Sequence, residues 1–100
     1  MEKRKAHYPL ITVKRLAAER RVSFTVTALA GAAAMGFATD EMLGVVSSLT
    51  SRNLYKSMTS HVNHTVWHDV CHANTSRGLV YLKLTVIENL LIVSFKEKEE

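Results

Sequence analysis

The stretch "GLVYLKLTVIENLLIVSFKE", residues 78–97, decides the fold of this chain. It is rich in the β-branched and aromatic residues that are typical of strands. Its first half alternates between two faces, an apolar one with Val80, Leu82, Leu84 and Val86 and a more polar one with Tyr81, Lys83 and Thr85. Glu88 and Asn89 are a plausible two-residue turn, since Asn tolerates positive φ. The stretch therefore predicts a hairpin with one core face and one face free for solvent or a ligand.

Two further strands are expected before this hairpin. They are "NLYKSMT" (53–59) and "TVWHDVCH" (65–72), and residues 74–78 are expected to form a loop before the hairpin. A short strand is also expected at "VSF" (22–24).

The first half of the chain has helical patterns. Residues 8–21 form the first predicted helix, with Pro9 in its first turn and Leu10, Val13 and Ala17 on one face. Thr27 is expected to cap a second helix, "ALAGAAAM", that Gly36 ends, and its small residues indicate close packing. Thr39 or Asp40 is expected to cap a third helix, "EMLGVVSSL". Helices followed by strands indicate an α+β fold, with helices packed on one face of an antiparallel sheet, in a single domain of residues 1–100.

Composition narrows the class of protein. The chain is 47% hydrophobic and 22% charged, with a net charge of +4, as expected for a globular domain. A basic surface suits nucleic acid, an acidic partner protein or a membrane headgroup layer, although many small soluble proteins are this basic. No apolar run approaches the roughly 20 residues that span a membrane, and no secretory signal is recognisable. The single cysteine, Cys71, makes no internal disulfide, which indicates a reducing compartment and hence the cytoplasm.

Four of the five histidines lie within "HVNHTVWHDVCH", residues 61–72. His64, His68 and His72 are spaced by four, which on a helix places them about 6 Å apart, near enough to share a zinc ion. On a strand they are about 13 Å apart, and no single ion bridges that distance. The residues between them are typical of a strand, so we expect no metal site. Solvated positions on a half-exposed strand are the simplest interpretation, and spacing alone does not identify an active site.

Several blocks of this sequence resemble the MqsR toxin family. They are "NLYKSMTS" (53–60), "HTVWHDVCH" (64–72), "GLVYLKLTVI" (78–87) and "LLIVSFKEK" (91–98), and the opening "MEKRKAHYPL" with "VKRLAAERRV" is similar too. The resemblance covers essentially the whole chain, and it is weakest in "SFTVTALAGAAAMGF" (23–37). It implies a RelE-like ribonuclease fold, with helices against a curved, mainly antiparallel sheet. It also implies an endoribonuclease that cuts mRNA with a preference for GCU and needs no cofactor. The implied partner is a zinc-binding, helix-turn-helix antitoxin like MqsA.

The resemblance also implies a catalytic site. The family's proposed lysine, glutamine and tyrosine fall on Lys56, His68 and Tyr81, so that His68 stands where glutamine is expected. The aromatic residue expected at position 71 is Cys71, and residues 73–77 diverge as well. These departures leave a second interpretation open, a degenerate toxin that only binds its antitoxin or RNA. A DNA-binding regulator is a third class, but no convincing helix-turn-helix is present.

If the chain cleaves RNA without a metal ion, Lys56, His68 and Tyr81 have to fill specific chemical roles. The 2′-hydroxyl is the nucleophile, so the site needs a base, an acid and a cation for the phosphate. Lys56 supplies charge, Tyr81 is a proton donor, and His68 is either a base or a positioning group. Arg77 and Lys83 are expected to hold phosphates. Tyr55 and Trp67 are candidates to stack a base, although Trp67 is expected in the core.

Overall fold

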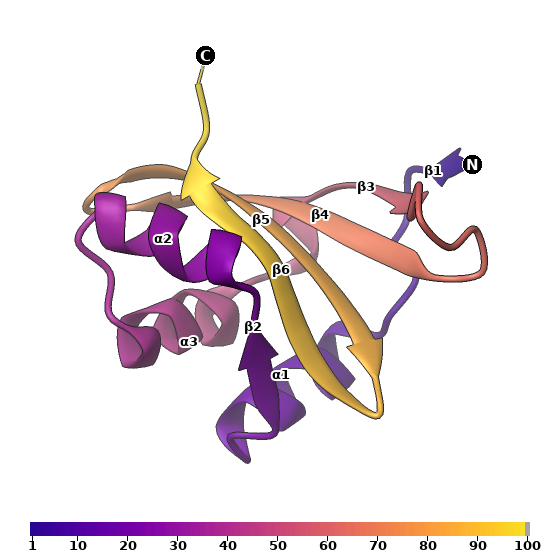
Figure 1. Ribbon diagram of the computed structural model, residues 1–100, viewed down its shortest axis with the longest axis horizontal. Coiled ribbons are helices and arrows are strands. Elements are labelled where there is room, and N and C mark those ends of the chain that lie inside the picture. The colour runs from indigo at the N-terminus through magenta and orange to yellow at the C-terminus, as the bar shows by residue number, and fades with distance from the viewer. Residues whose placement is uncertain (100) are drawn as a thin grey trace.

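The computed structural model describes residues 1–99, which form a curved six-stranded sheet with helices on one side (Figure 1). The strands lie in the order β1-β3-β4-β5-β6-β2, and every neighbouring pair is antiparallel except β2 with β6. Their bounds are β1 Glu2–Lys3, β2 Val22–Phe24, β3 Leu54–Thr59, β4 Trp67–Thr75, β5 Gly78–Ile87 and β6 Asn89–Glu97. The predicted α+β class is confirmed.

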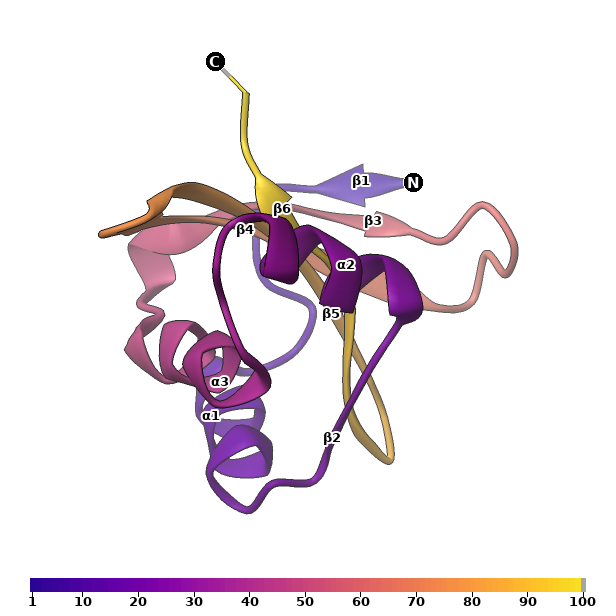
Figure 2. The ribbon, with the colours of Figure 1, turned by 60° about the vertical axis from the view of Figure 1, so that its left-hand side comes forward.

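The helices cover one face of the sheet and leave the other open. They are α1 Leu10–Ala18, α2 Val26–Ala34, α3 Thr39–Ser48 and the short 3-10 helix η1 Ser51–Asn53. Figure 2 shows α1 and α3 together beneath the sheet, while α2 packs against β6. The opposite face carries no helix from the described residues, and we call it the open face.

The helix ends follow from local hydrogen bonding. The amide groups of Arg20 and Arg21 bond to the carbonyls of Ala17 and Leu16, and Arg20 adopts φ 57°. This Schellman-type end stops α1 at Ala18, three residues earlier than predicted. Gly36, with φ 85°, ends α2 as predicted.

Two predicted helix caps were wrong. Thr25, rather than Thr27, caps α2, because its Oγ1 accepts a hydrogen bond from the Ala28 amide at 3.0 Å. Neither Thr39 nor Asp40 caps α3. The carboxylate of Glu41 instead reaches back and accepts from the Ala38 amide at 2.9 Å.

The expectation of close packing along α2 is confirmed at Gly31. A Cβ atom there would lie 2.1 Å from the backbone oxygen of Phe95, so no larger residue fits without a shift of the backbone. Ala28 and Ala32 on the same helix are fully buried. The small residues therefore bring α2 directly onto β6, and Phe95 packs into the core.

The hairpin of β5 and β6 follows the predicted alternation in its apolar half. Val80, Leu82 and Leu84 are buried in the core, but Thr85 is buried as well, contrary to expectation. Its hydroxyl lies 2.7 Å from the Trp67 carbonyl and 2.9 Å from the Tyr8 hydroxyl, so a polar partner replaces solvent. The turn is also tighter than predicted. Ile87 pairs with Asn89, and only Glu88, with φ 64°, lies between them.

The strands before the hairpin differ from prediction at their ends. β4 begins at Trp67 and extends to Thr75, so that the expected loop is only the turn of Ser76 and Arg77. The connection from β3 to β4 is longer and contains His61 and His64.

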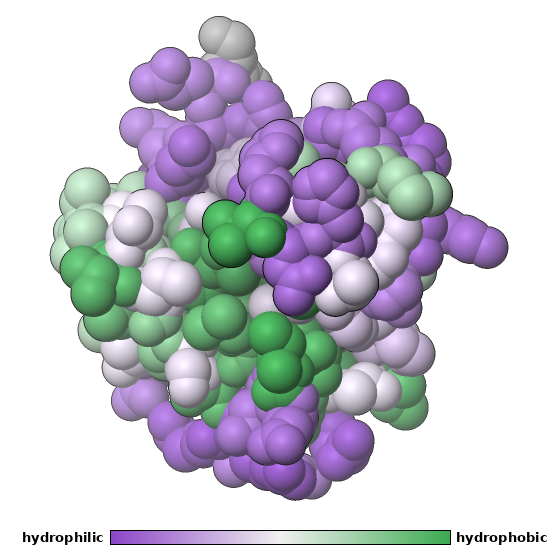
Figure 3. Space-filling view, turned by 45° about the vertical axis from the view of Figure 1, so that its right-hand side comes forward, coloured by the Kyte–Doolittle hydropathy of each residue, from purple (hydrophilic) through white to green (hydrophobic). Residues whose placement is uncertain are grey.

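The surface of the molecule is mixed. Figure 3 shows an apolar area on the face that it views, bordered by hydrophilic groups above and below. Exposed large apolar residues include Ile11, Val26, Val62 and Ile87. Within residues 1–99 no single helix is long and apolar enough to cross a membrane, although α2 and α3 together, bent by 90°, have that length and composition.

Candidate active site on the open face of the sheet

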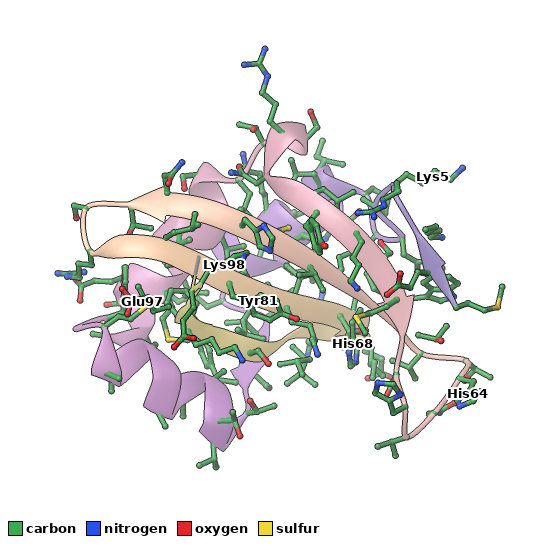
Figure 4. All side chains as sticks on the ribbon, turned by 90° about the horizontal axis from the view of Figure 1, so that it is seen from above. Lys5, His64, His68, Tyr81, Glu97 and Lys98 are labelled. Carbon is green, nitrogen blue, oxygen red and sulfur yellow. The ribbon has the colours of Figure 1, made fainter. Side chains whose placement is uncertain are left out.

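Side chains from β3, β4, β5 and β6 lie together on the open face, where Figure 4 shows His68 and Tyr81. Directly paired residues on neighbouring strands project to the same face. One row across the sheet is therefore Lys56, Val70, Lys83 and Ser94, and the next is His72, Tyr81 and Lys96. His68, paired with Met58, lies on the other side of the first row. Val70 is fully buried although it lies outside the core cluster, so side chains of the open face cover it.

Lys56 is held by an ion pair with the N-terminal strand. Its Nζ lies 2.6 Å from Oε1 of Glu2, and the Lys56 side chain is 23% exposed. The hydrogen bond that Lys56 donates to Glu2 raises the pKa of Lys56 above its usual value. Lys56 is therefore a fixed positive charge, suited to hold a phosphate and unsuited to give up a proton.

Tyr81 lies beside cations in the middle of the face. Burial raises the pKa of its phenol, and the nearby charge of Lys56 partly opposes this rise. Nζ of Lys96 lies 5.2 Å from the centre of the Tyr81 ring. An open hollow of about 410 Å³ is lined by Tyr81 and residues 96–99. Tyr81 stays protonated at neutral pH and is a hydrogen-bond donor to an anion placed there.

His68 and Lys83 form the other part of the site. Burial lowers the pKa of His68, and the charge of Lys83 lowers it further. Burial likewise lowers the pKa of Lys83, with Lys96 and Lys56 adding to the effect. At neutral pH His68 is thus an uncharged imidazole, with one donor and one acceptor. A glutamine amide offers the same two functions, so His68 can make the hydrogen bonds of the glutamine that the family resemblance leads us to expect here.

The N-terminal segment is fixed by a buried carboxylate. Asp69, which is 3% exposed, accepts hydrogen bonds from the amides of His7 at 2.9 Å and Tyr8 at 3.0 Å. Its carboxylate also contacts the hydroxyl of Ser57, which bonds to the Lys5 carbonyl at 2.8 Å. These bonds secure the segment that carries Glu2 to Lys56.

Tyr55 and Arg77, which were predicted to bind RNA, lie in two different parts of the structure. Tyr55 lies on the open face and is 44% exposed. Arg77 is in the turn after β4, where it pairs with Glu41 at 2.7 Å and lies over the ring of Phe37. The structure therefore separates Arg77 from Lys56, His68 and Tyr81.

The expectation of a core position for Trp67 was wrong. Trp67 is partly exposed at the start of β4, where the ring of His7 stacks on it at 5.1 Å. The ammonium of Lys3 lies 4.3 Å from the centre of its ring. The N-terminal segment, rather than the core, covers this side chain.

Cys71 faces away from the site. It lines an apolar cavity of about 410 Å³ on the helix side of the sheet, and burial raises the pKa of its thiol to about 12. The thiol is therefore not a nucleophile near neutral pH. The departure from the family at this position alters the core and leaves the open face unchanged.

Sequence analysis did not select three residues of this face for the site, namely Glu2, His72 and Lys96. Lys96 faces Tyr81 because of the hairpin register, which a correct turn at Glu88 and a bulge in β6 would have predicted. Glu2 meets Lys56 through the pairing of β1 with β3, and nothing in the local sequence indicates that contact.

The histidines do not gather around one point. His68 and His72 lie on β4, whereas His64 lies in the preceding loop. Figure 4 shows His64 well away from His68. In the described part of the chain, residues 1–99, no group of three or more His, Cys, Asp or Glu side chains is placed to hold a metal ion.

Comparison with known proteins gives the family. Residues 5–97 match the family described as "Motility quorum-sensing regulator, toxin of MqsA". The chain is also 46% identical to the mRNA interferase toxin MqsR of Escherichia coli (strain K12), over 98% of this chain and 100% of that protein. A match of this extent establishes kinship along the whole length. The chain belongs to the MqsR toxin family.

Proposed function

We propose that this protein is an endoribonuclease toxin that cleaves mRNA without a metal ion, preferentially at GCU sequences, in the cytoplasm. The relative in Escherichia coli is named an mRNA interferase toxin. The observation that most supports the proposal is the convergence of Lys56, Tyr81 and His68 from β3, β5 and β4 on one open face. Lys83 and Lys96 add positive charge there, as a phosphate substrate requires.

The proposed reaction uses the 2′-hydroxyl of the RNA as nucleophile. Its oxygen attacks the adjacent phosphorus while its proton passes to a water molecule, and the bond from phosphorus to the 5′-oxygen breaks. The departing 5′-oxygen takes a proton, and the products are a 2′,3′-cyclic phosphate and a 5′-hydroxyl. Lys56 neutralises the charge that grows on the phosphate oxygens in the transition state. Electrostatic stabilisation of this kind is usually the largest single contribution to catalysis.

Tyr81 and His68 complete the proposed site. The phenol of Tyr81 donates a hydrogen bond to the phosphate or the leaving oxygen, and its position beside Lys56 and Lys96 favours an anion within reach. Neutral His68 orients the phosphate or a base by hydrogen bonding, as the glutamine of relatives would. Lys83, which lies on β5 in the same row as Lys56 and close enough to His68 to lower the pKa of His68, is proposed as a second contact to phosphate.

Cleavage of defined RNA in EDTA tests the proposal. Purified protein is expected to cut an oligonucleotide that contains GCU and to cut a matched oligonucleotide with the order UCG much more slowly. Lys56→Met should abolish cleavage, whereas Lys14→Met on α1 should leave it unchanged. RNA that remains intact, or that is cut only after Mg²⁺ is added, contradicts the proposal. Expression should also arrest growth, and a binding module without activity would not do so.

We further propose an antitoxin of the MqsA kind as the partner, a zinc-binding protein with a helix-turn-helix domain. The family description names the toxin of MqsA, and a cell tolerates a free ribonuclease only if a partner restrains it. Co-expression with the product of the neighbouring gene should restore growth and yield one complex on size-exclusion chromatography. Separate elution of the two proteins would count against this partner.

A further inference from the structure

Three aromatic rings form a row across β3, β4 and β5, next to the row that contains Lys56. The rings of Tyr55 and His72 are stacked, with centroids 4.6 Å apart and planes 22° apart. The His72 and Tyr81 rings follow at 6.0 Å with a tilt of 39°. The stacked pair therefore adjoins both Lys56, through Tyr55, and Tyr81, through His72.

A β-bulge places Tyr55 in this row. Leu54 pairs with Cys71 and Lys56 pairs with Val70, so that Tyr55 is one extra residue on β3. Strict alternation would send Tyr55 and Lys56 to opposite faces, but both lie on the open face because the bulge interrupts it. Bulges of this kind commonly redirect a side chain beside a functional site.

The surroundings of the pair suit a nucleotide. Tyr55 is 44% exposed and lies outside the core. The guanidinium of Arg4 lies 5.3 Å from its ring centre, and Nζ of Lys56 lies 5.6 Å away. Burial and the charge of Lys98 lower the pKa of His72, so its ring stacks without a charge at neutral pH. Exposed aromatic rings flanked by cations are the usual means of holding an unpaired base and its phosphates.

We propose that the Tyr55–His72 pair is a base-stacking subsite for the nucleotide adjoining the scissile phosphate of single-stranded RNA. The inference rests on the proposed ribonuclease function and assigns His72 as a residue that positions the substrate. A base stacked there holds its phosphate between Lys56 and Tyr81. Because every base has an aromatic face, this subsite fixes position and contributes little to the choice of base.

Binding of RNA with single missing bases tests the subsite. The probe is a GCU-containing oligonucleotide with a 2′-deoxy nucleotide at the cleavage position, which prevents cleavage. A set of matched probes lacks one base at each position around that nucleotide. Fluorescence anisotropy gives the Kd for the wild type, His72→Ala and His72→Phe. His64→Ala, in the exposed loop after β3, is the control.

The subsite predicts coupling between one base and His72. On intact RNA, His72→Ala should weaken binding about tenfold, His72→Phe should bind within about threefold of wild type, and His64→Ala should not change Kd. On the probe that lacks the base bound at this subsite, the wild type should bind as weakly as His72→Ala binds intact RNA. His72→Ala and the wild type should bind that probe with the same Kd. If His72→Ala does not fold, as judged by circular dichroism, Tyr55→Ala is measured in the same way.

Contrary outcomes separate the subsite from the proposed function. If the wild type cleaves unmodified RNA but His72→Ala weakens binding equally on all probes, or on none, the subsite is wrong and the ribonuclease stands. If the wild type does not cleave unmodified RNA, the proposed function fails, and the subsite fails with it.

Discussion

Oε1 of Glu2 lies 2.6 Å from Nζ of Lys56, so one of the three donors of this ammonium is already bonded to a carboxylate. The bond lowers the pKa of Glu2, which keeps it charged throughout the neutral range. A phosphate that binds Lys56 as proposed would share the ammonium with this carboxylate, and we expect the two anions to compete for it. The N-terminal strand thus contributes a carboxylate to this face, and under the proposed function it is expected to compete with RNA.

The substitution Glu2→Gln tests this competition. Removing the negative charge should lower KM for RNA by about twofold to tenfold and leave kcat nearly unchanged, as expected for the loss of a competing interaction in the free enzyme. Steady-state kinetics on a GCU oligonucleotide measures both constants. Glu19→Gln, which removes an exposed carboxylate just after the end of α1, is the matched control. A fall in kcat of about 100-fold would show instead that Glu2 is a base or positions Lys56.

His68 is expected to position the substrate without transferring a proton. His68→Gln should therefore retain activity within about tenfold of wild type. The pKa of His68 is lowered, so protonation opposes the folded state. The free energy of unfolding should fall as pH drops below about 6.5 and should be insensitive to this group above that value. Thermal unfolding at several pH values should show a smaller acid loss in His68→Gln. If His68→Gln is as inactive as Lys56→Met, the histidine carries the proton transfer.

Substitutions at Lys83 distinguish a role for its positive charge from a role as a proton donor. Its pKa is lowered by burial and by neighbouring lysines, which gives Lys83 a more labile proton than Lys56 has. As a phosphate contact it needs only its charge, so Lys83→Arg should keep activity within about tenfold and Lys83→Met should lose about 100-fold. Arginine does not release a proton near neutral pH. Equal inactivity of the two variants, both shown to be folded, would identify Lys83 as the acid.

Asp69 is predicted to matter for stability through the N-terminal segment. The two carboxylate oxygens of Asp69 accept hydrogen bonds from the amides of His7 and Tyr8. Asp69→Asn replaces one of these acceptor oxygens with an NH₂ group, which only donates. The free energy of unfolding should fall by about 2 kcal/mol, or roughly 10 °C in Tm for a domain of this size. Asp40→Asn breaks an exposed ion pair with Arg20 and should cost less than about 0.5 kcal/mol. Similar melting of the two variants would show that the buried carboxylate does not anchor the segment.

Much of the fold was predictable because apolar periodicity follows burial. The alternation of Val80, Leu82 and Leu84 identified the core face of β5, and Gly36 marked the end of α2. The family resemblance named Lys56, His68 and Tyr81, and the structure brings all three to one face. Periodicity alone could not select them, because any polar position on that face fits the pattern equally well.

The bulges were not predictable from alternation. Leu84 pairs with Ile92 but Lys83 pairs with Ser94, so Val93 is an extra residue on β6. Strict alternation from Ile92 would send Lys96 into the core, whereas the bulge buries Phe95 and places Lys96 beside Tyr81. The bulge at Tyr55 has the same effect on β3. Long-range contacts such as Glu2 with Lys56 join residues 54 positions apart, and no local pattern encodes them.

The most direct test of the central claim is the single-turnover cleavage of a GCU oligonucleotide in EDTA, with the products identified by mass spectrometry. Wild-type protein should give a 2′,3′-cyclic phosphate and a 5′-hydroxyl, and one 2′-deoxy substitution at the cleavage position should stop the reaction. Lys56→Met and Tyr81→Phe, each shown to be folded by circular dichroism, should be slower by about 100-fold or more. Cleavage of the 2′-deoxy substrate, or full activity in both variants, would contradict catalysis on the open face.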